Sequence, residues 1–306
     1  MAVREPGWAE VEAPTVTLRA LRWQPAQDGK IAPIALCLHG FPDTPHGWRF
    51  VAPKLVAAGW RVVAPFMRGY APSTIPSDGS YHIGAVMDDA LRVLNAAGPT
   101  GRDVVIGHDW GAMAAWGLAT DADGPFTKAV AMSLPPGPTF RPCRGNGVRR
   151  SLPALLPGLL LRMWHVEYFQ IPWLPDRSAS WLVPRLWRQW SPGFDATEDL
   201  RHVDAAIGSP ESWRAAIGFY RANVRAARPP KPYVSLQQSW QAEARIPVLY
   251  MHGADDRCMT SKITDRVGRV LPRGGAVRVI EHAGHFLQLE QPDTVVGHIL
   301  DFIGPA

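Results

Sequence analysis

The sequence predicts an α/β protein in which a doubly wound, mostly parallel sheet carries an inserted helical lid. Short apolar runs alternate with helical segments over residues 34–134, and the alternation returns over 246–302. Residues 136–230 lack a buried-strand pattern and hold six of the thirteen tryptophans among proline-broken helical segments. This rhythm indicates a core of residues 1–135 and 231–306 with residues 136–230 as a helical cap, which we call the lid.

The elements of the first half each have a local signal. Residues 16–23 alternate between apolar and polar side chains, as an edge strand does, whereas residues 34–38 are an unbroken apolar run that suits a strand covered on both faces. Helical spacing over residues 48–59 ends at a glycine, which is typical of a helix C-terminus. The expected elements are strands at 16–23, 34–38, 60–65, 104–106 and 129–134, and helices at 48–59 and 83–97.

The second half continues the same pattern. We expect a strand at 246–251, a helix at 262–271, a strand at 276–280 and a last helix at 293–302. Ligands of open parallel sheets collect outside the carboxyl ends of the strands. The functional residues are therefore expected in the loops that follow these strands.

Composition excludes several classes of protein. With 46% apolar and 19% charged residues, the 306-residue chain is globular. Its first residues are polar and mixed in charge, unlike a secretory signal, so we expect a cytoplasmic protein. The most apolar run, residues 152–164, is interrupted by prolines and Arg162 and falls short of the roughly 20 residues of a spanning helix. No transmembrane segment is predicted.

The net charge of +5 is unevenly distributed along the chain. Residues 136–230 hold thirteen arginines against seven acidic residues. Solvated helix faces account for this excess more simply than a surface for acidic lipids or anionic substrates, and no nucleic-acid motif occurs. Cys37, Cys143 and Cys258 are an odd, scattered set without metal-ligand spacing, so neither a disulfide framework nor a metal site is predicted.

Residues 103–116 pass from an apolar strand through a glycine-flanked turn into an alanine-rich helix. Asp109 lies at the turn, within GHDWG at 107–111. Small residues on both sides let a tight turn raise one side chain above a parallel sheet, as in a nucleophile elbow. A carboxylate is ionised near neutral pH and can attack carbon directly to give an enzyme ester. A glycine-rich turn with a helix-capping aspartate is the alternative.

An enzyme ester must be opened by water that a base deprotonates, and histidine suits this role. Among the ten histidines, His285 follows the expected strand at 276–280 in a loop that leaves the carboxyl edge of the sheet. Its neighbour His282 has the same local position, but Gly284 gives His285 the freer approach. We therefore expect His285 to be the base.

The carboxylate that orients the imidazole should follow another strand end. Asp255 and Asp256 both follow the strand at 246–251, and Asp256 is preferred because the extra residue carries it past the strand tip. Either residue could instead belong to a turn or cap the next helix. The chain order of Asp109, this acid and His285 is that of α/β-hydrolases.

Water attack on the ester generates an oxyanion that backbone N–H groups should stabilise. The N–H of Trp110, at the start of the helix after Asp109, is one expected donor, and the N–H of Phe41 in HGFP at 39–42 is the second. His39 and His108 are expected to hold the loops through hydrogen bonds rather than to take part in the reaction.

Five motifs around the expected lid now carry a family resemblance: HGFP at 39–42, RGYAPS at 68–73, GHDWGA at 107–112, GADD at 253–256 and GHF at 284–286. In this order the chain resembles the α/β-hydrolase epoxide hydrolases over nearly its whole length. The resemblance implies an α/β-hydrolase fold with an aspartate nucleophile and no cofactor. Haloalkane and haloacetate dehalogenases share the aspartate elbow, so the family is better specified than the reaction.

Epoxide hydrolases of this kind typically use two lid tyrosines to hold the epoxide oxygen. The second resembles Tyr220, but the position of the first is occupied by His165. An imidazole can donate a hydrogen bond as a phenol does, and Tyr168 is the fallback donor. Ordinary lid packing is the alternative role for all three. The residues expected to bind substrate are Trp110, Phe41, Tyr168, Trp164 and Phe169.

The expected substrates are a small apolar epoxide and water, giving a vicinal diol through a hydroxyalkyl ester on Asp109. A dehalogenase is the first alternative, with Trp110 and either Trp164 or Trp173 as halide donors, although Phe41 lacks the side-chain N–H found in many dehalogenases. A lid-gated binder of small apolar molecules is the second. A homodimer is left open.

Overall fold

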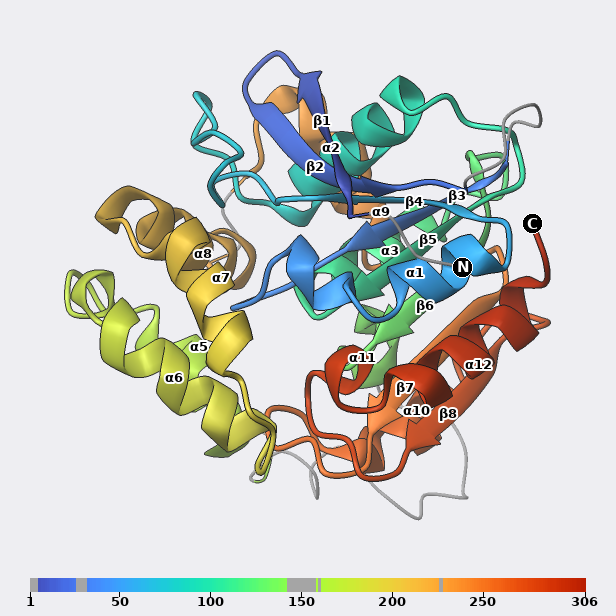
Figure 1. Cartoon of the computed structure of the whole chain (residues 1–306). Coiled ribbons are helices and arrows are strands. Elements are labelled where there is room, and N and C mark those ends of the chain that lie inside the picture. Colours follow the sequence, from blue (N-terminus) through green and yellow to red (C-terminus); the bar gives the residue numbers. More distant parts are fainter. Residues whose placement is uncertain (1–4, 26–31, 142–157, 159–160, 226–227) are drawn as a thin grey trace.

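The computed structural model describes residues 5–25, 32–141, 158, 161–225 and 228–306. Cys143 and most of the apolar run at 152–164 lie outside these residues. The described strands form one eight-stranded sheet in the order β1-β2-β4-β3-β5-β6-β7-β8 (Figure 1). The strands are β1 Gly7–Glu12, β2 Thr17–Trp23, β3 Ile34–Leu38, β4 Arg61–Pro65, β5 Asp103–His108, β6 Phe126–Met132, β7 Val248–Gly253 and β8 Ala276–Ile280.

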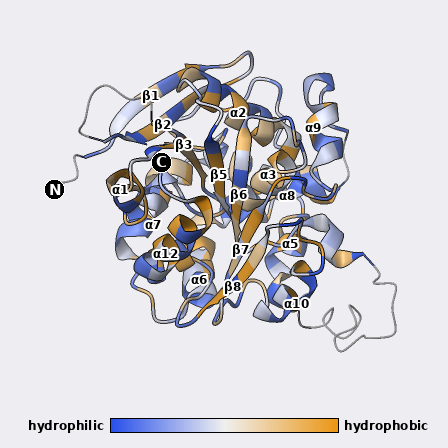
Figure 2. Cartoon of the chain, turned by 90° about the vertical axis from the view of Figure 1, so that its right-hand side faces the viewer, coloured by the Kyte–Doolittle hydropathy of each residue, from blue (hydrophilic) through white to orange (hydrophobic). Residues whose placement is uncertain are grey.

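Strand direction follows the predicted alternation of strands and helices. β3 to β8 run parallel to one another, whereas β1 and β2 are antiparallel neighbours and β2 also pairs antiparallel with β4. Every residue of β3, β5 and β7 is buried, which explains their unbroken apolar runs. Figure 2 shows these central strands as the hydrophobic middle of the molecule. The predicted α/β class with a mostly parallel sheet is confirmed.

Helices cover both faces of the sheet (Figure 2). α2, α3 and α9 pack on one another on one face, and α1 and α12 pack together on the other. The helices outside the lid are α1 Ala52–Ala57, α2 Ile83–Ala96, α3 Trp110–Leu118, α9 Val234–Ser239, α10 Thr264–Val267, α11 Leu287–Glu290 and α12 Pro292–Ile303. The 3₁₀ turns outside the lid are η1 Pro45–Trp48, η4 Lys231–Tyr233 and η5 Ser261–Ile263, and η2 Gly137–Phe140 lies at the start of the lid segment.

The chain between β6 and β7 builds the predicted lid from helices (Figure 1, left). They are α5 Trp164–Tyr168, η3 Pro175–Arg177, α6 Ala179–Trp190, α7 Thr197–Ile207 and α8 Pro210–Val224. The described part of residues 136–230 contains no strand, as the sequence indicated. The domain boundaries at 136 and 230 stay a prediction. Among the described residues, no helix is both long and apolar enough to cross a membrane.

Three expectations about elements were wrong in detail. β2 is not the edge strand, because residues 7–12 form β1 and pair along it. The helix expected at 262–271 is reduced to η5 and the four-residue α10, because Gly268 and Pro272 leave little room for longer helical spacing. The helix expected at 48–59 is shortened to α1 Ala52–Ala57, and η1 ends at Trp48, where that helix was expected to begin.

Candidate active site

The turn between β5 and α3 holds Asp109 in a conformation that few residues adopt. Its φ is 52° and its ψ is −119°, in the left-handed half of backbone space. The glycines around it are required by close backbone approach: a Cβ on Gly107 would overlap the carbonyl of Gly111, and one on Gly40 would overlap the side chain of Asp109. The predicted elbow is therefore a physically constrained turn, and it raises the Asp109 carboxylate above the sheet.

The two oxygens of Asp109 face different partners. Oδ1 accepts a hydrogen bond from the Phe41 N–H at 2.7 Å, and Oδ2 lies 3.6 Å from Nε2 of His285. Burial alone would raise the pKa of Asp109, but His285 and the Phe41 N–H hold it below its ordinary value. The carboxylate is therefore ionised. In the described structure the N–H of Trp110, the other predicted donor, makes no hydrogen bond to this carboxylate.

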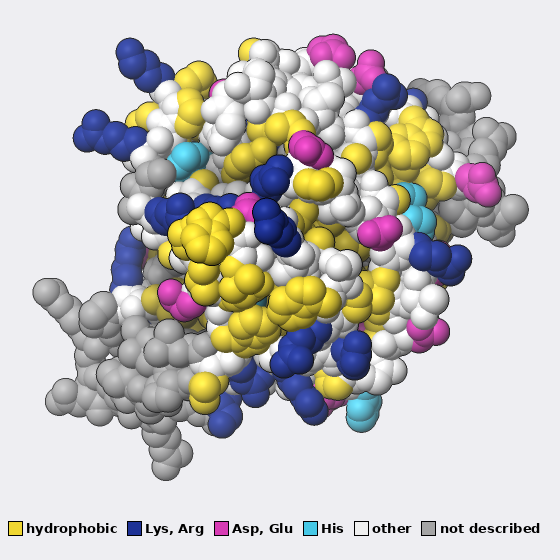
Figure 3. All heavy atoms as spheres, turned by 90° about the vertical axis from the view of Figure 1, so that its left-hand side faces the viewer, with side chains coloured by type: hydrophobic (Ala, Val, Ile, Leu, Met, Phe, Trp, Pro, Cys, Tyr) yellow, Lys and Arg dark blue, Asp and Glu magenta, His cyan; other side chains and the backbone are white. Residues whose placement is uncertain are grey.

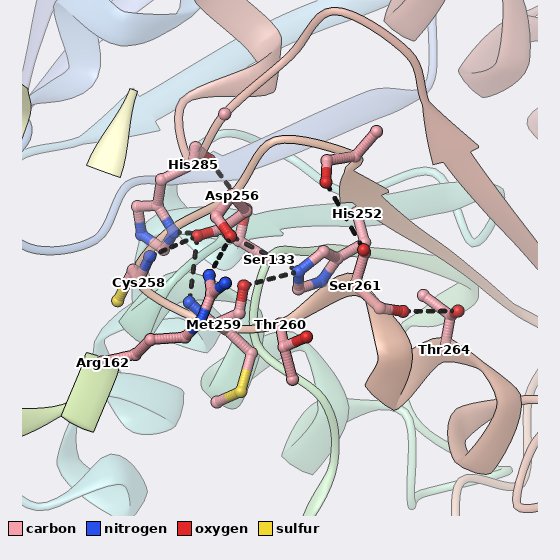
Figure 4. Close-up of polar contacts among 12 residues, drawn as sticks. Ser133, Arg162, His252, Asp256, Cys258, Met259, Thr260, Ser261, Thr264 and His285 are labelled. Carbon is pink, nitrogen blue, oxygen red and sulfur yellow. Dashed lines mark hydrogen bonds and ion pairs between the residues drawn. The ribbon is translucent and has the colours of Figure 1, made fainter. Parts of the chain in front are cut away.

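His285 and Asp256 form a buried pair beside the elbow (Figure 4). Nδ1 of His285 donates to Oδ2 of Asp256 at 3.0 Å. Oδ1 of Asp256 accepts from the backbone N–H groups of Cys258 and Met259 at 2.7 and 3.0 Å. Burial would lower the pKa of His285, but the carboxylates of Asp256 and Asp109 together raise it to about 10. The resting imidazole is therefore protonated.

The structure places the two rejected candidates away from this pair. Asp255 is exposed to solvent, and so is His282, which occupies a left-handed turn with a φ of 56°. His39 holds loops as expected, because its Nε2 accepts from the N–H of Met67 and its Nδ1 donates to the carbonyl of Gly40. The geometry thus selects Asp256 and His285 from the pairs that the sequence offered.

The backbone of His285 is fixed by His108, which was expected to hold a loop, and by Ser133, Trp190 and Arg162, which sequence reasoning did not assign to the site. Its carbonyl accepts from Nε2 of His108 at 2.9 Å and from Oγ of Ser133 at 2.7 Å. Its N–H donates to the carbonyl of Trp190 at 3.2 Å, and Arg162 donates to the carbonyl of Asp256 at 2.7 Å. Trp190 and Arg162 belong to the lid segment, so the lid helps to hold the base.

A second set of contacts ties the end of α6 to the loop that carries His285. Ser191 donates to Oε1 of Glu290 at 2.6 Å and accepts from the N–H of Phe286 at 3.2 Å. Oε2 of Glu290 accepts from the N–H of Gly284 at 2.8 Å. The ring of Trp187 stacks on Phe286 with centroids 3.6 Å apart. Sequence reasoning missed this set because no local pattern relates residues about a hundred positions apart.

A cavity of about 190 Å³ opens onto Asp109. Tyr220 and His165 both line it, with ring centroids 5.6 Å apart. Burial lowers the pKa of His165 to about 3 and raises the pKa of Tyr220 well above its ordinary value, so both side chains are neutral at physiological pH. The remaining walls are largely apolar and include Met113, Leu134, Met163, Val166, Trp240 and Met259.

Several residues expected to bind substrate lie outside the lining of this cavity. Phe41 and Phe169 are fully buried behind Tyr220, with their ring centroids 5.2 and 4.8 Å from its own. Tyr168 and Trp164 pack on each other toward the outside of the lid, so Tyr168 is not a second donor at the cavity. Of the five predicted contacts, Trp110 alone lines the cavity. A helical turn places neighbouring lid residues on opposite faces, and the sequence did not show which face turns inward.

Trp173 is 78% exposed at the lid surface, which removes it as a halide donor. The Nε1 atoms of Trp110 and Trp190 are buried without a hydrogen-bond partner among the described residues. Within the same part of the chain, no group of three or more His, Cys, Asp or Glu side chains could hold a metal ion.

Residues 35–298 match the model of the alpha/beta hydrolase family. The match covers most of the chain, so the protein belongs to the alpha/beta hydrolase family, and the prediction of a hydrolase is confirmed. The chain is 28% identical over 277 residues to the AB hydrolase superfamily protein YfhM of Bacillus subtilis, covering 89% of this chain and 90% of that protein. It is 27% identical over 301 residues to epoxide hydrolase A of Mycobacterium tuberculosis, with the same two coverages.

Solved structures show the same fold. Epoxide hydrolase A of Mycobacterium thermoresistibile has a TM-score of 0.71 and 24% identity, over 97% of this chain and 98% of that one. A haloalkane dehalogenase loop variant from Bradyrhizobium elkanii has a TM-score of 0.73 and 19% identity, over 98% and 97%. Because the two scores are nearly equal, the reaction has to be argued from the site.

Proposed function

We propose that the protein is an epoxide hydrolase that converts a small apolar epoxide to a vicinal diol through an ester on Asp109. The observation that carries the proposal is the placement of two neutral donors, Tyr220 and His165, across one cavity from the ionised Asp109. An epoxide oxygen stays attached to its substrate and gains negative charge as the ring opens. Donors aimed at that oxygen stabilise the charge in the transition state.

The first step follows from the unequal oxygens of Asp109. Oδ1 is held by the Phe41 N–H at 2.7 Å, so Oδ2, which lies 3.6 Å from Nε2 of His285, is the oxygen that attacks. It forms a bond to one epoxide carbon while the bond from that carbon to the epoxide oxygen breaks. Tyr220 and His165 hydrogen-bond the oxygen as it gains charge, and it leaves this step as the hydroxyl of a hydroxyalkyl ester after taking a proton from one of them.

The second step depends on the charge that the first step removes. Once Asp109 is an ester, it no longer stabilises the imidazolium, so the pKa of His285 falls from its resting value of about 10. The proton that His285 releases returns through solvent to the donor that lost one in the first step. Neutral His285, oriented by Asp256, then takes a proton from water, and the water oxygen bonds to the ester carbon. Phe41 N–H donates to the oxyanion that forms at Oδ1. As this intermediate collapses, the bond to the ester oxygen breaks, that oxygen takes the proton of the added hydroxyl, and the diol leaves while the Asp109 carboxylate and the protonated His285 return.

The cavity supports an apolar substrate. Its walls are mostly methionine, leucine, valine and tryptophan side chains. Asn223 also lines the cavity, but its side-chain amide is already hydrogen-bonded to the backbone of Phe219, Tyr81 and Ile83. Aryl or alkyl epoxides therefore fit better than polar ones. The cytoplasmic location and the homodimer stay predictions, which cell fractionation and light scattering would test.

A single turnover in heavy-oxygen water tests the covalent route. Water attack at the ester carbon leaves one labelled oxygen in Asp109, which peptide mass analysis would detect. An unlabelled Asp109 after turnover, with the label only in the diol, would show direct water attack on the epoxide and overturn the mechanism.

Dehalogenation is the second candidate, because the unpartnered Nε1 of Trp110 beside Asp109 could donate to a halide. A substrate panel separates the two: epoxide turnover without halide release supports the proposal, and halide release from haloalkanes or haloacetates with epoxides untouched supports a dehalogenase. A lid-gated binder would bind such compounds without product and would be indifferent to Asp109→Asn.

A further inference from the structure

The lid has an outer face, away from the active-site cavity, where large apolar side chains gather. We define the outer lid face by Trp164, Tyr168, Ile171, Trp173, Leu174 and Trp181. Trp173 is 78% exposed, Leu174 56%, Trp181 52% and Ile171 43%. Tyr168 lies against both Trp164 and Trp181, with ring centroids 5.9 and 6.3 Å apart, and residues 171–174 follow shortly after it in the chain. Isolated exposed apolar residues need no explanation, but a group of this kind marks an interaction surface.

Residues 169–174 form the apolar loop of this face, and hydrogen bonds from α8 and its C-terminal end hold this loop in place. Arg221 donates from Nε to the carbonyl of Phe169 and from Nη2 to that of Ile171, at 2.9 and 3.3 Å. Arg225 donates to the carbonyl of Gln170 at 2.8 Å. Trp173 itself occupies a left-handed conformation with a φ of 47°, which is strained for an aromatic residue. The fold therefore holds the exposed Trp173 in a backbone conformation that is unfavourable for its residue type.

Basic side chains border the outer lid face. Arg185 and Arg188 share a surface groove with Trp164, and Arg214 and Arg225 flank the loop. The arginines with exposed side chains here are Arg177, Arg185, Arg188, Arg214 and Arg225. Figure 3 looks at the lid side and shows hydrophobic side chains bordered by Lys and Arg.

Acidic groups do little to neutralise this border. Asp176 is paired with Arg221 at 3.0 Å and lies 3.8 Å from Arg214. Over the described residues 161–188 and 210–225, which carry the border, the other acidic residues are Glu167 on α5 and Glu211 on α8, and both are exposed. The face therefore keeps a net positive charge around its apolar centre.

We propose that the outer lid face docks onto an anionic lipid bilayer. Tryptophan, leucine and isoleucine enter the boundary between head groups and acyl chains, and arginines reach the phosphate groups while their stems lie on apolar surface. A second copy of the chain fits less well, because a two-fold contact sets this basic rim against itself. This docking would place the lid against the phase in which apolar molecules dissolve, and it does not depend on which reaction Asp109 performs.

Vesicle sedimentation of the purified full chain tests the proposal. We expect binding to phosphatidylcholine vesicles that contain about 30% phosphatidylglycerol, weaker binding to pure phosphatidylcholine, and loss of most binding as salt is raised to about 0.5 M. Equal binding to both vesicle types, or none to either at low salt, would overturn it.

Matched variants locate the surface. Trp173→Ser with Leu174→Ser should weaken vesicle binding about tenfold or more, because both side chains lose their buried area in the bilayer. Trp8→Ser is the control, since Trp8 is 51% exposed on β1, away from the lid. An equal loss in the control would show non-specific adhesion and contradict the proposal.

Variants that remove basic side chains test the electrostatic part of the proposal independently. Arg185→Gln with Arg188→Gln should weaken binding to anionic vesicles and flatten its salt dependence, whereas Arg22→Gln, an exposed arginine on β2, should not. Unchanged melting temperature and unchanged turnover of a water-soluble substrate show that each variant is folded. Light scattering distinguishes the rival occupant: a dimer that the Trp173/Leu174 variant dissociates, with no vesicle binding, would assign the face to a second copy.

Discussion

The sheet edge and the lid contribute to the candidate site in opposite ways. At the sheet edge, hydrogen bonds and ion pairs hold Asp109, Asp256 and His285 to backbone groups and to one another in the absence of substrate. The lid contributes Tyr220 and His165, whose neutral side chains face an apolar cavity. The core thus sets charge and orientation in advance, and the lid supplies donors for an oxygen that only the substrate brings. Variants of the two regions should therefore fail at different steps.

The largest effect is expected for Asp109→Asn. Removing the ionised oxygen abolishes ester formation, so kcat/KM for an epoxide should fall by at least about 10⁴-fold. Stopped-flow and mass analysis should detect no ester. Substrate binding, measured by quenching of lid tryptophans, should persist, because the cavity walls are unchanged. Turnover close to that of the parent would place the nucleophile elsewhere.

His285→Gln should separate the two steps. We expect kcat to fall about 10³-fold, because water loses its base, while the ester on Asp109 still forms and accumulates. The measurement is a burst in which one epoxide equivalent is consumed per chain, without diol release and with the ester found on Asp109. A variant that loses the burst as well would show that His285 is needed for attack too.

Tyr220→Phe tests the lid side. The loss of one donor to the epoxide oxygen should slow ester formation about 10²-fold and leave ester hydrolysis nearly unchanged. His165→Phe should act on the same step. Pre-steady-state rates resolve this, since the burst should slow in these variants and persist in His285→Gln. Slower hydrolysis with normal ester formation would contradict the division between the two regions.

Ser191→Ala probes the contact between the regions. Without the hydroxyl, Glu290 loses one partner and the loop of His285 loses one of its contacts with the end of α6, so ester hydrolysis should slow by about tenfold with ester formation unaffected. Ser178→Ala is the matched control, because Ser178 is also buried in the lid and its hydroxyl, within the part of the chain that the structure describes, donates only to the neighbouring carbonyl of Pro175. It should cost about 1 kcal/mol of unfolding free energy and leave both rates alone.

The smallest expected change is in a pH profile. Burial raises the pKa of Asp109, and in the parent enzyme His285, together with His108 and the Phe41 N–H, more than offsets that rise. His285→Gln removes the contribution of His285, so the folded pKa of Asp109 should rise. Ester formation needs the ionised form and is lost as pH falls through this pKa, so the acid limb of the burst rate should move to higher pH. An acid limb that stays in place would show that His285 does not set the charge of Asp109.

The parallel sheet could be predicted because its strands are marked by local patterns. Residues 34–38 are apolar throughout because β3 is covered on both faces. The GHDWG stretch can form the elbow because its glycines have no Cβ that would clash with the backbone lying against them. The sequence did not predict β1, because β1 lies at the edge of the sheet and most of its residues are exposed to solvent, so it lacks the apolar run of a buried strand. The helix at 262–271 was overestimated because helical spacing alone does not show where packing ends it.

The sequence by itself determined the fold class, the tight turn at Asp109 and the candidate acids and bases that could act with Asp109. Each of these depends on a short contiguous stretch whose residue types and spacing can be interpreted without knowing what packs against it. Only the tertiary structure decided between Asp255 and Asp256, brought Ser191 to Glu290, and turned His165 inward while Tyr168 faced outward. These choices depend on contacts between residues far apart in the chain and on rotations of single helices. Such contacts exist only once the lid has packed on the sheet.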